Sequence, residues 1–197
     1  TTNLNLKLIP FLLNRVLPGG CGEQAGSKFI RAVLIYEYLK SKNALNSDEL
    51  QNIPRELKAL LNHMKDNKFH SDGSYDLWST ANSNDGWYYA PRGKTTSTWL
   101  TAYVIRVITQ AMISQTIDYD YWMLKRSLDY LSSKKSIGTY LYFTNDGYSK
   151  DPYHPATIKS NMYTTSFVLL SFIYFERLWG SSYYGGIVES GINYLDA

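Results

Sequence analysis

Three stretches of the chain are apolar on nearly every side of a predicted helix. They cover residues 24–39, 97–114 and 161–179, and none of them has the broad polar face of a surface helix. A helix that is apolar nearly all round is buried, because each of its sides is more stable away from water. The pattern therefore predicts three inner helices, which start near Gln24, Ser97 and Asn161.

An amphipathic stretch follows the first of these inner helices. In residues 48–64 the apolar side chains recur at three- and four-residue spacing, with charged side chains between them. Asn46, Ser47 and Asp48 are N-cap candidates, because their side-chain oxygens accept hydrogen bonds from the free N–H groups of a first helical turn. Pro54 costs little helix stability if it lies in that first turn, where its missing N–H group removes no helical hydrogen bond. This stretch predicts an outer helix.

Two more outer helices are predicted in the same way, one after each remaining inner helix. Asp118 or Asp120 caps the first of them, which ends near Ser133, and residues 187–195 form the second. Between them, residues 134–160 are polar and aromatic, and we interpret them as a long loop, because strand signals are weak. The core side chains expected on the helix that ends near Ser133 are Trp122, Leu124, Leu128, Tyr130 and Leu131.

Inner and outer helices alternate along the chain, and each inner helix must bury its surface against its neighbours. The sequence predicts an all-α fold of three stacked α/α hairpins. Ahead of them, Pro10 divides the apolar residues 4–16 into two short turns. A chain of 197 residues with 44% apolar residues is long enough for one substantial core. We therefore expect residues 1–197 to form a single domain.

Charge and cysteine content narrow the classes of function. The net charge is +3 and the basic side chains are scattered, so we expect no nucleic-acid partner. No apolar run reaches the length of a membrane span. The single cysteine excludes an internal disulfide framework. Because the chain starts and ends abruptly, we interpret it as a part of a larger protein.

The only cysteine lies in the most specific chemical signal of the chain, the sequence Gly-Cys-Gly-Glu-Gln that starts at Gly20. The Cys21 thiol can attack the side-chain amide of Gln24 and expel ammonia, which closes an internal thioester. Gly22 lets the backbone fold tightly enough for the two side chains to meet, and Glu23 lies between them. The motif predicts an acyl group that is already activated for transfer, with a thiolate as its leaving group.

This motif resembles the thioester motif of the family that contains complement components, alpha-2-macroglobulins and insect thioester proteins. Residues 72–75, 97–104 and 164–168 resemble later segments of the same domain, so the resemblance covers most of the chain. In the family the glutamine is usually followed by Asn-Met, whereas alanine and glycine follow it here. The resemblance implies a toroid of six α/α hairpins, of which this chain holds about three.

The resemblance also implies a function. It indicates a secreted opsonin of innate immunity that attaches covalently to a target cell surface after proteolytic activation, in a single turnover rather than by enzymatic catalysis. The alternative is a macroglobulin-like protease inhibitor that cross-links trapped proteases through their lysines. The other domains of the parent protein are expected partners. A half toroid exposes an apolar edge, so a companion chain or a dimer is also expected.

A histidine decides the acceptor in members of the family that transfer to hydroxyl groups. It attacks the thioester first, and members without it transfer mainly to amines. The family's histidine precedes the third inner helix, and His154 is the only histidine in residues 134–160. We therefore take His154 as the candidate transacylation nucleophile or base, although Asn145 or Asp146 fits the position in one alignment. No group with metal-ligand spacing accompanies the motif, so we expect no metal and no cofactor.

Two other classes of protein are compatible with helical hairpins. Terpene cyclases, prenyltransferases and glycosidases with an α/α toroid need an Asp-rich motif, a zinc set or a spaced carboxylate pair. The sequence has no Asp-rich motif, and Cys21 has no zinc partners. The third hypothesis is an interaction fragment whose thioester never forms. Intact mass distinguishes it, because closure removes one ammonia.

Overall fold

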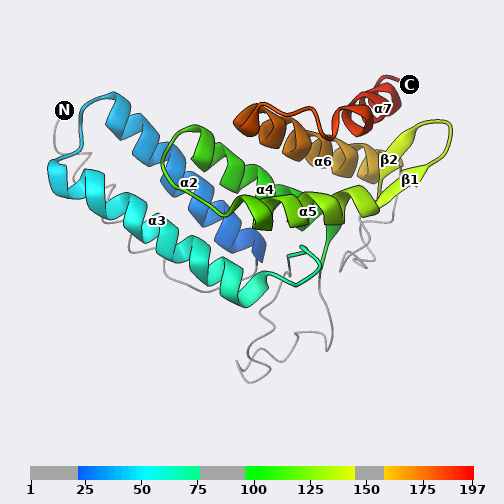
Figure 1. Ribbon diagram of the computed structural model, residues 1–197. Coiled ribbons are helices and arrows are strands. Elements are labelled where there is room, and N and C mark those ends of the chain that lie inside the picture. The colour runs from blue at the N-terminus through cyan, green and yellow to red at the C-terminus, as the bar shows by residue number, and fades with distance from the viewer. Residues whose placement is uncertain (1–21, 76–95, 145–157) are drawn as a thin grey trace.

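The computed structural model of the chain describes residues 22–75, 96–144 and 158–197. Within these residues the chain is mostly helical and forms three consecutive helical hairpins, which confirms the predicted all-α class (Figure 1). The elements are α2 (Gly22–Ser41), α3 (Ser47–Lys68), α4 (Thr98–Ile113), α5 (Tyr121–Ser133), β1 (Lys135–Ile137), β2 (Leu141–Phe143), α6 (Ile158–Trp179) and α7 (Gly185–Asp196).

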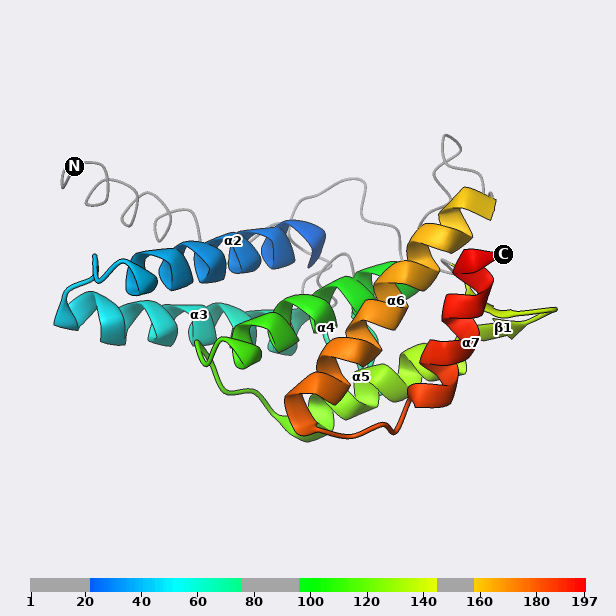
Figure 2. The same ribbon diagram turned by 90° about the horizontal axis from the view of Figure 1, so that it is seen from above.

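The three inner helices lie side by side in one row, α2 next to α4 and α4 next to α6 (Figures 1 and 2). Each outer helix packs on the inner helix of its own hairpin. The predicted starts of the inner helices near Gln24 and Ser97 are confirmed, and the third begins slightly earlier than predicted, at Ile158. Three hairpins in a row are compatible with part of a toroid, and the closed ring stays a prediction.

The predicted capping residues account for where the helices begin. Ser97 Oγ accepts a hydrogen bond from a first-turn N–H group of α4 at 3.2 Å. Asp120, and not Asp118, caps α5 by accepting a first-turn N–H group at 2.9 Å. Asn46 and Glu49 form a capping box at the start of α3, with both bonds at 2.9 Å. Each bond satisfies a backbone donor that has no partner inside the helix.

Pro54 lies in the interior of α3, beyond the first turn in which it would cost little. A proline has no N–H group, so the carbonyl of Leu50, four residues earlier, loses its helical donor. The hydroxyl of Tyr36 on α2 donates a hydrogen bond to this carbonyl at 3.3 Å. The neighbouring helix thus supplies the donor that the proline lacks, and α3 continues beyond it to Lys68.

A short antiparallel hairpin of β1 and β2 occupies part of the segment that the sequence predicts as a loop. Ser136 lies opposite Tyr142 in this hairpin. Phe143 is fully buried, and its N–H group donates to Thr165 Oγ1 on α6 at 2.9 Å. The loop prediction is wrong here because strands of three residues are too short to show periodicity. Their pairing is stabilised by the packing of β2 on α6 and α7.

The prediction that Trp122 belongs to the core is also wrong, because its side chain is 69% exposed. Its neighbour Tyr121 points inward instead. The Tyr121 ring packs on Phe175 and Trp179 of α6, with centroid distances of 5.6 and 5.1 Å. Adjacent residues on a helix face different directions, so only one of the two aromatic rings can reach the core. The other predicted core side chains of α5, Leu124, Leu128, Tyr130 and Leu131, are buried.

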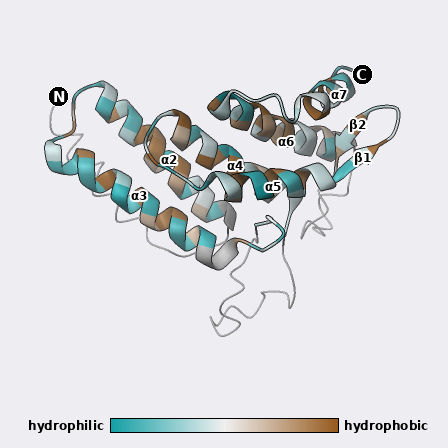
Figure 3. Ribbon diagram, viewed as in Figure 1, coloured by the Kyte–Doolittle hydropathy of each residue, from teal (hydrophilic) through white to brown (hydrophobic). Residues whose placement is uncertain are grey.

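Apolar residues gather along the inner helices, where Figure 3 shows brown ribbon on α2, α4 and α6. Some of these side chains are not covered by the described part of the chain. No helix among the described residues is both long and apolar enough to cross a membrane. The exposed apolar side chains of the inner helices are Leu34 and Tyr38 on α2 and Met162, Tyr163, Leu170 and Ile173 on α6.

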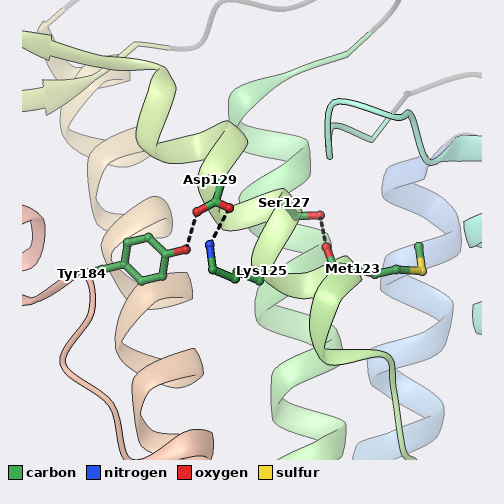
Figure 4. Close-up of polar contacts among 5 residues, drawn as sticks. All are labelled: Met123, Lys125, Ser127, Asp129 and Tyr184. Carbon is green, nitrogen blue, oxygen red and sulfur yellow. Dashed lines mark hydrogen bonds and ion pairs between the residues drawn. The ribbon is translucent and has the colours of Figure 1, made fainter.

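A polar contact joins α5 to the connection between α6 and α7 (Figure 4). The carboxylate of Asp129 accepts hydrogen bonds from Lys125 Nζ at 2.7 Å and from the Tyr184 hydroxyl at 2.9 Å. The Tyr184 side chain is buried, and burial together with the bond to Asp129 raises the pKa of its hydroxyl well above the ordinary value. Tyr184 therefore stays protonated and donates to Asp129 at any physiological pH.

Candidate functional site

Gln24 lies on the first turn of α2, and its side chain is exposed. The two residues after it, Ala25 and Gly26, are buried and mark the side of the helix that packs on the rest of the domain. Gln24 therefore presents its carboxamide on the other side of the turn, where a second reactive group can approach it.

The other residues of the motif are placed only in part. Gly22 and Glu23 form the start of α2, and the structure describes their backbone but not the Glu23 side chain. Gly20 and Cys21 precede Gly22 in the sequence and lie outside the described residues. The predicted pairing of Cys21 with Gln24 stays a prediction.

His154 also lies outside the described residues, in the segment between β2 and α6. Its predicted role, and the alternatives Asn145 and Asp146, are therefore not tested by the geometry. The described parts bring Gly26, two residues after Gln24, against Tyr103 of α4 and do not place Gln24 relative to His154.

Three aromatic rings form a row that begins at Gly26 of α2, and we call Tyr103, Trp99 and Phe167 the aromatic row. The Tyr103 ring lies against the backbone of Gly26. Trp99 stacks parallel to Tyr103 at a centroid distance of 5.4 Å, and Phe167 of α6 meets the Trp99 ring edge-on at 5.8 Å. All three side chains are half-buried. The row runs from the start of α2 across α4 to the middle of α6.

Sequence reasoning assigned no role to these rings, although the segment that contains Trp99 and Tyr103 resembles the family. Their spacing of four residues places both on one side of α4. That spacing is a usable signal for a stacked pair. The contact with Gly26 has no such signal, because it joins residues that are far apart in the sequence.

The position of the motif suits a reaction that releases a thiolate. The first N–H groups of a helix have no intrahelical acceptors, and the helix dipole is positive at this end. Both effects stabilise negative charge near Gly22.

Helical hairpins with Gly-Cys-Gly-Glu-Gln at the start of the first inner helix define the class of helical domain found in thioester-containing proteins. Comparison with known proteins agrees, because the family model described as the A-macroglobulin TED domain matches residues 11–197. The chain belongs to the A-macroglobulin TED domain family. This confirms the resemblance to complement components, alpha-2-macroglobulins and insect thioester proteins.

Similar full-length proteins are known from a mosquito. Thioester-containing protein 1 allele R1 of Anopheles gambiae is 27% identical over 207 residues, which cover 99% of this chain and 14% of that protein. Alleles S3 and S1 of the same protein are each 26% identical over 204 residues, which cover 98% of this chain and again 14% of the relative. The chain thus spans a small part of the length of these relatives.

Proposed function

We propose that Cys21 and Gln24 form an internal thioester and that this chain is the thioester domain of a secreted, complement-like protein of innate immunity. The observation that carries the proposal is the Gly-Cys-Gly-Glu-Gln sequence, which ends in an exposed glutamine on the first turn of α2. In the closing step the sulfur of Cys21 bonds to Cδ of Gln24, the bond from Cδ to nitrogen breaks, and ammonia leaves with the thiol proton.

The thioester then transfers its acyl group once. After a proteolytic cut elsewhere exposes it, a hydroxyl or amino group on a target surface attacks Cδ of Gln24. The bond from Cδ to sulfur breaks, Cys21 leaves as a thiolate, and the target stays attached as an ester or amide. The chain is consumed in this reaction, so it acts as a self-acylating reagent rather than an enzyme. No metal or cofactor takes part in these steps.

The exposed apolar side chains of α2 and α6 are the reason to propose that this domain is part of a larger assembly. An isolated domain with such open sides is prone to association. Further hairpins of the same toroid, carried by the rest of the parent protein, are the proposed cover. A companion chain or a dimer of this chain would cover the same side chains, and sedimentation of the full-length protein distinguishes the three arrangements.

Intact mass and thiol titration of the freshly purified full-length protein test the thioester. We expect no free thiol at Cys21, a mass lower than the sequence mass by one ammonia, and incorporation of one methylamine at Gln24. Cys21→Ala and Gln24→Glu each abolish this incorporation. Gln51→Glu, which changes an exposed glutamine of α3, is the matched control and leaves it unchanged. A free Cys21 thiol at full sequence mass, before amine treatment, would contradict the proposal.

His154 is the proposed group that directs the acyl group to hydroxyl acceptors. It attacks Cδ of Gln24, forms an acyl-imidazole, and leaves the Cys21 thiolate to deprotonate the acceptor hydroxyl. We expect His154→Ala to lose glycerol incorporation into the activated full-length protein by roughly 100-fold or more, as for other removed acid–base groups. Methylamine incorporation stays near the wild-type level, because amines attack the thioester directly.

His63→Ala is the control, since it removes a different histidine, which lies on α3. An unchanged ratio of glycerol to methylamine incorporation in His154→Ala would remove His154 from the mechanism. Lysines would then be the favoured acceptors, and the alternative function, a protease inhibitor that cross-links trapped proteases, would replace the opsonin.

A further inference from the structure

The start of α2 is in direct contact, at Gly26, with an aromatic ring of α4. Gly26, two residues after Gln24, is buried, and a Cβ atom placed on it would lie 2.7 Å from Cε1 of Tyr103 and 3.3 Å from Cδ1. Carbon atoms pack best at about 3.5–4.0 Å, so the ring occupies the space that a side chain at residue 26 would need. The contact exists because residue 26 is glycine.

The Tyr103 ring is itself held in place by the rest of the aromatic row. Trp99, one turn earlier on α4, lies parallel to it with an interplanar angle of 1°. Phe167 of α6 packs edge-on against Trp99. Stacked and edge-on aromatic pairs are favourable beyond the area they bury. Phe167 thus supports Trp99, Trp99 supports Tyr103, and Tyr103 packs against the start of α2. The position of this start therefore depends on side chains of both α4 and α6.

A first helical turn needs such a constraint if one of its side chains is to react. Its N–H groups lack intrahelical acceptors, and helix ends fray. Closure of the thioester ring requires Cδ of Gln24 to stay within reach of the Cys21 sulfur. Small misplacements of reacting groups have large effects on the reaction rate. We infer that Tyr103 is a positioning residue for the acyl group of Gln24. This inference rests on the proposed thioester and adds the residue that holds its glutamine.

Tyr103→Leu in the full-length protein tests this role. The fraction of molecules that have lost ammonia is measured by intact mass on the folded, monodisperse protein. We expect this closed fraction to fall by about tenfold, within the range that misplaced reacting groups show. Tyr103→Phe keeps the ring and keeps wild-type closure. Gly26→Ala displaces the ring and also lowers closure. The double variant Gly26→Ala, Tyr103→Leu closes no worse than Tyr103→Leu, because both changes remove the same contact.

Leu128→Ala separates positioning from general stability. Leu128 is fully buried on α5, so this variant lowers the thermal midpoint, and we expect it to leave the closed fraction of folded molecules unchanged. Complete closure in Tyr103→Leu, or an equal loss of closure in Leu128→Ala, would overturn the inference and leave the proposed function intact. Wild-type protein at full sequence mass would instead overturn the proposed function and the inference with it.

Discussion

Replacing Gly73 with alanine is expected to lower the free energy of unfolding by about 3–5 kcal/mol, the sum of two separate penalties. Gly73 has φ +93°, a backbone conformation that alanine adopts only with strain. A Cβ atom at this position would also lie 2.6 Å from the carbonyl carbon of Arg126 and 2.9 Å from the amide nitrogen of Ser127, both in the backbone of α5. Neither backbone atom can move without moving the helix. Urea denaturation followed by circular dichroism measures the loss.

Two other glycines separate these penalties. Gly180 has φ +64° and nothing within 4 Å of its Cβ position, so Gly180→Ala tests the backbone strain alone and costs about 1–2 kcal/mol. Gly186 in α7 has open space and no positive φ, so Gly186→Ala is neutral or stabilising by about 0.5–1 kcal/mol. Equal denaturation midpoints for Gly73→Ala and Gly186→Ala would show that the turn at Gly73 does not pack on α5.

Phe172→Ala is expected to cost about 3–5 kcal/mol, the usual range for removing a buried phenylalanine side chain. Phe172 on α6 is fully buried between two other aromatic rings. Its ring centroid lies 4.5 Å from that of Tyr184 and 6.3 Å from that of Phe143 on β2. The cavity left by the substitution separates α6 from the hairpin and from the start of α7. Thermal and chemical denaturation report the loss.

Hydrogen exchange gives the location of this effect, with faster exchange expected first in β2 and α7. The matched control is Ile173→Ala, because this neighbouring side chain is 38% exposed and removing it leaves no closed cavity. Similar losses of stability in the two variants would mean that Phe172 does not lie at the centre of this packing.

Local chemistry allowed much of the helical framework to be predicted. Ser97, Asp120 and Asn46 cap their helices with contacts to residues two or three positions away, so the sequence contains all the information that the contact needs. The same holds for the buried stripes of α5, where Leu124, Leu128 and Leu131 recur at helical spacing.

The sequence predictions that were wrong or incomplete concern residues whose contacts are distant in sequence. The bond between Phe143 and Thr165 joins the β1–β2 hairpin to α6, and neither three-residue strand shows a period by itself. Tyr121 and Trp122 are both large and aromatic, so hydrophobicity alone could not decide which one α6 would cover. At the site, chemistry pointed to Gln24, whereas the contact of Tyr103 with Gly26 appears only when α2 and α4 are packed together.

The hydrogen bond from Tyr36 to the Leu50 carbonyl makes the order of evolutionary change at two positions matter. If residue 54 first changes from proline to a residue with an N–H group, the carbonyl regains its helical donor, and the tyrosine hydroxyl can then be lost without an unpaired group. If Tyr36 changes to phenylalanine first, the carbonyl has no donor in either helix, and only water can supply its hydrogen bond in that intermediate. Residues 36 and 54 are therefore epistatic, and lineages can exchange this pair readily along only one of the two mutational routes.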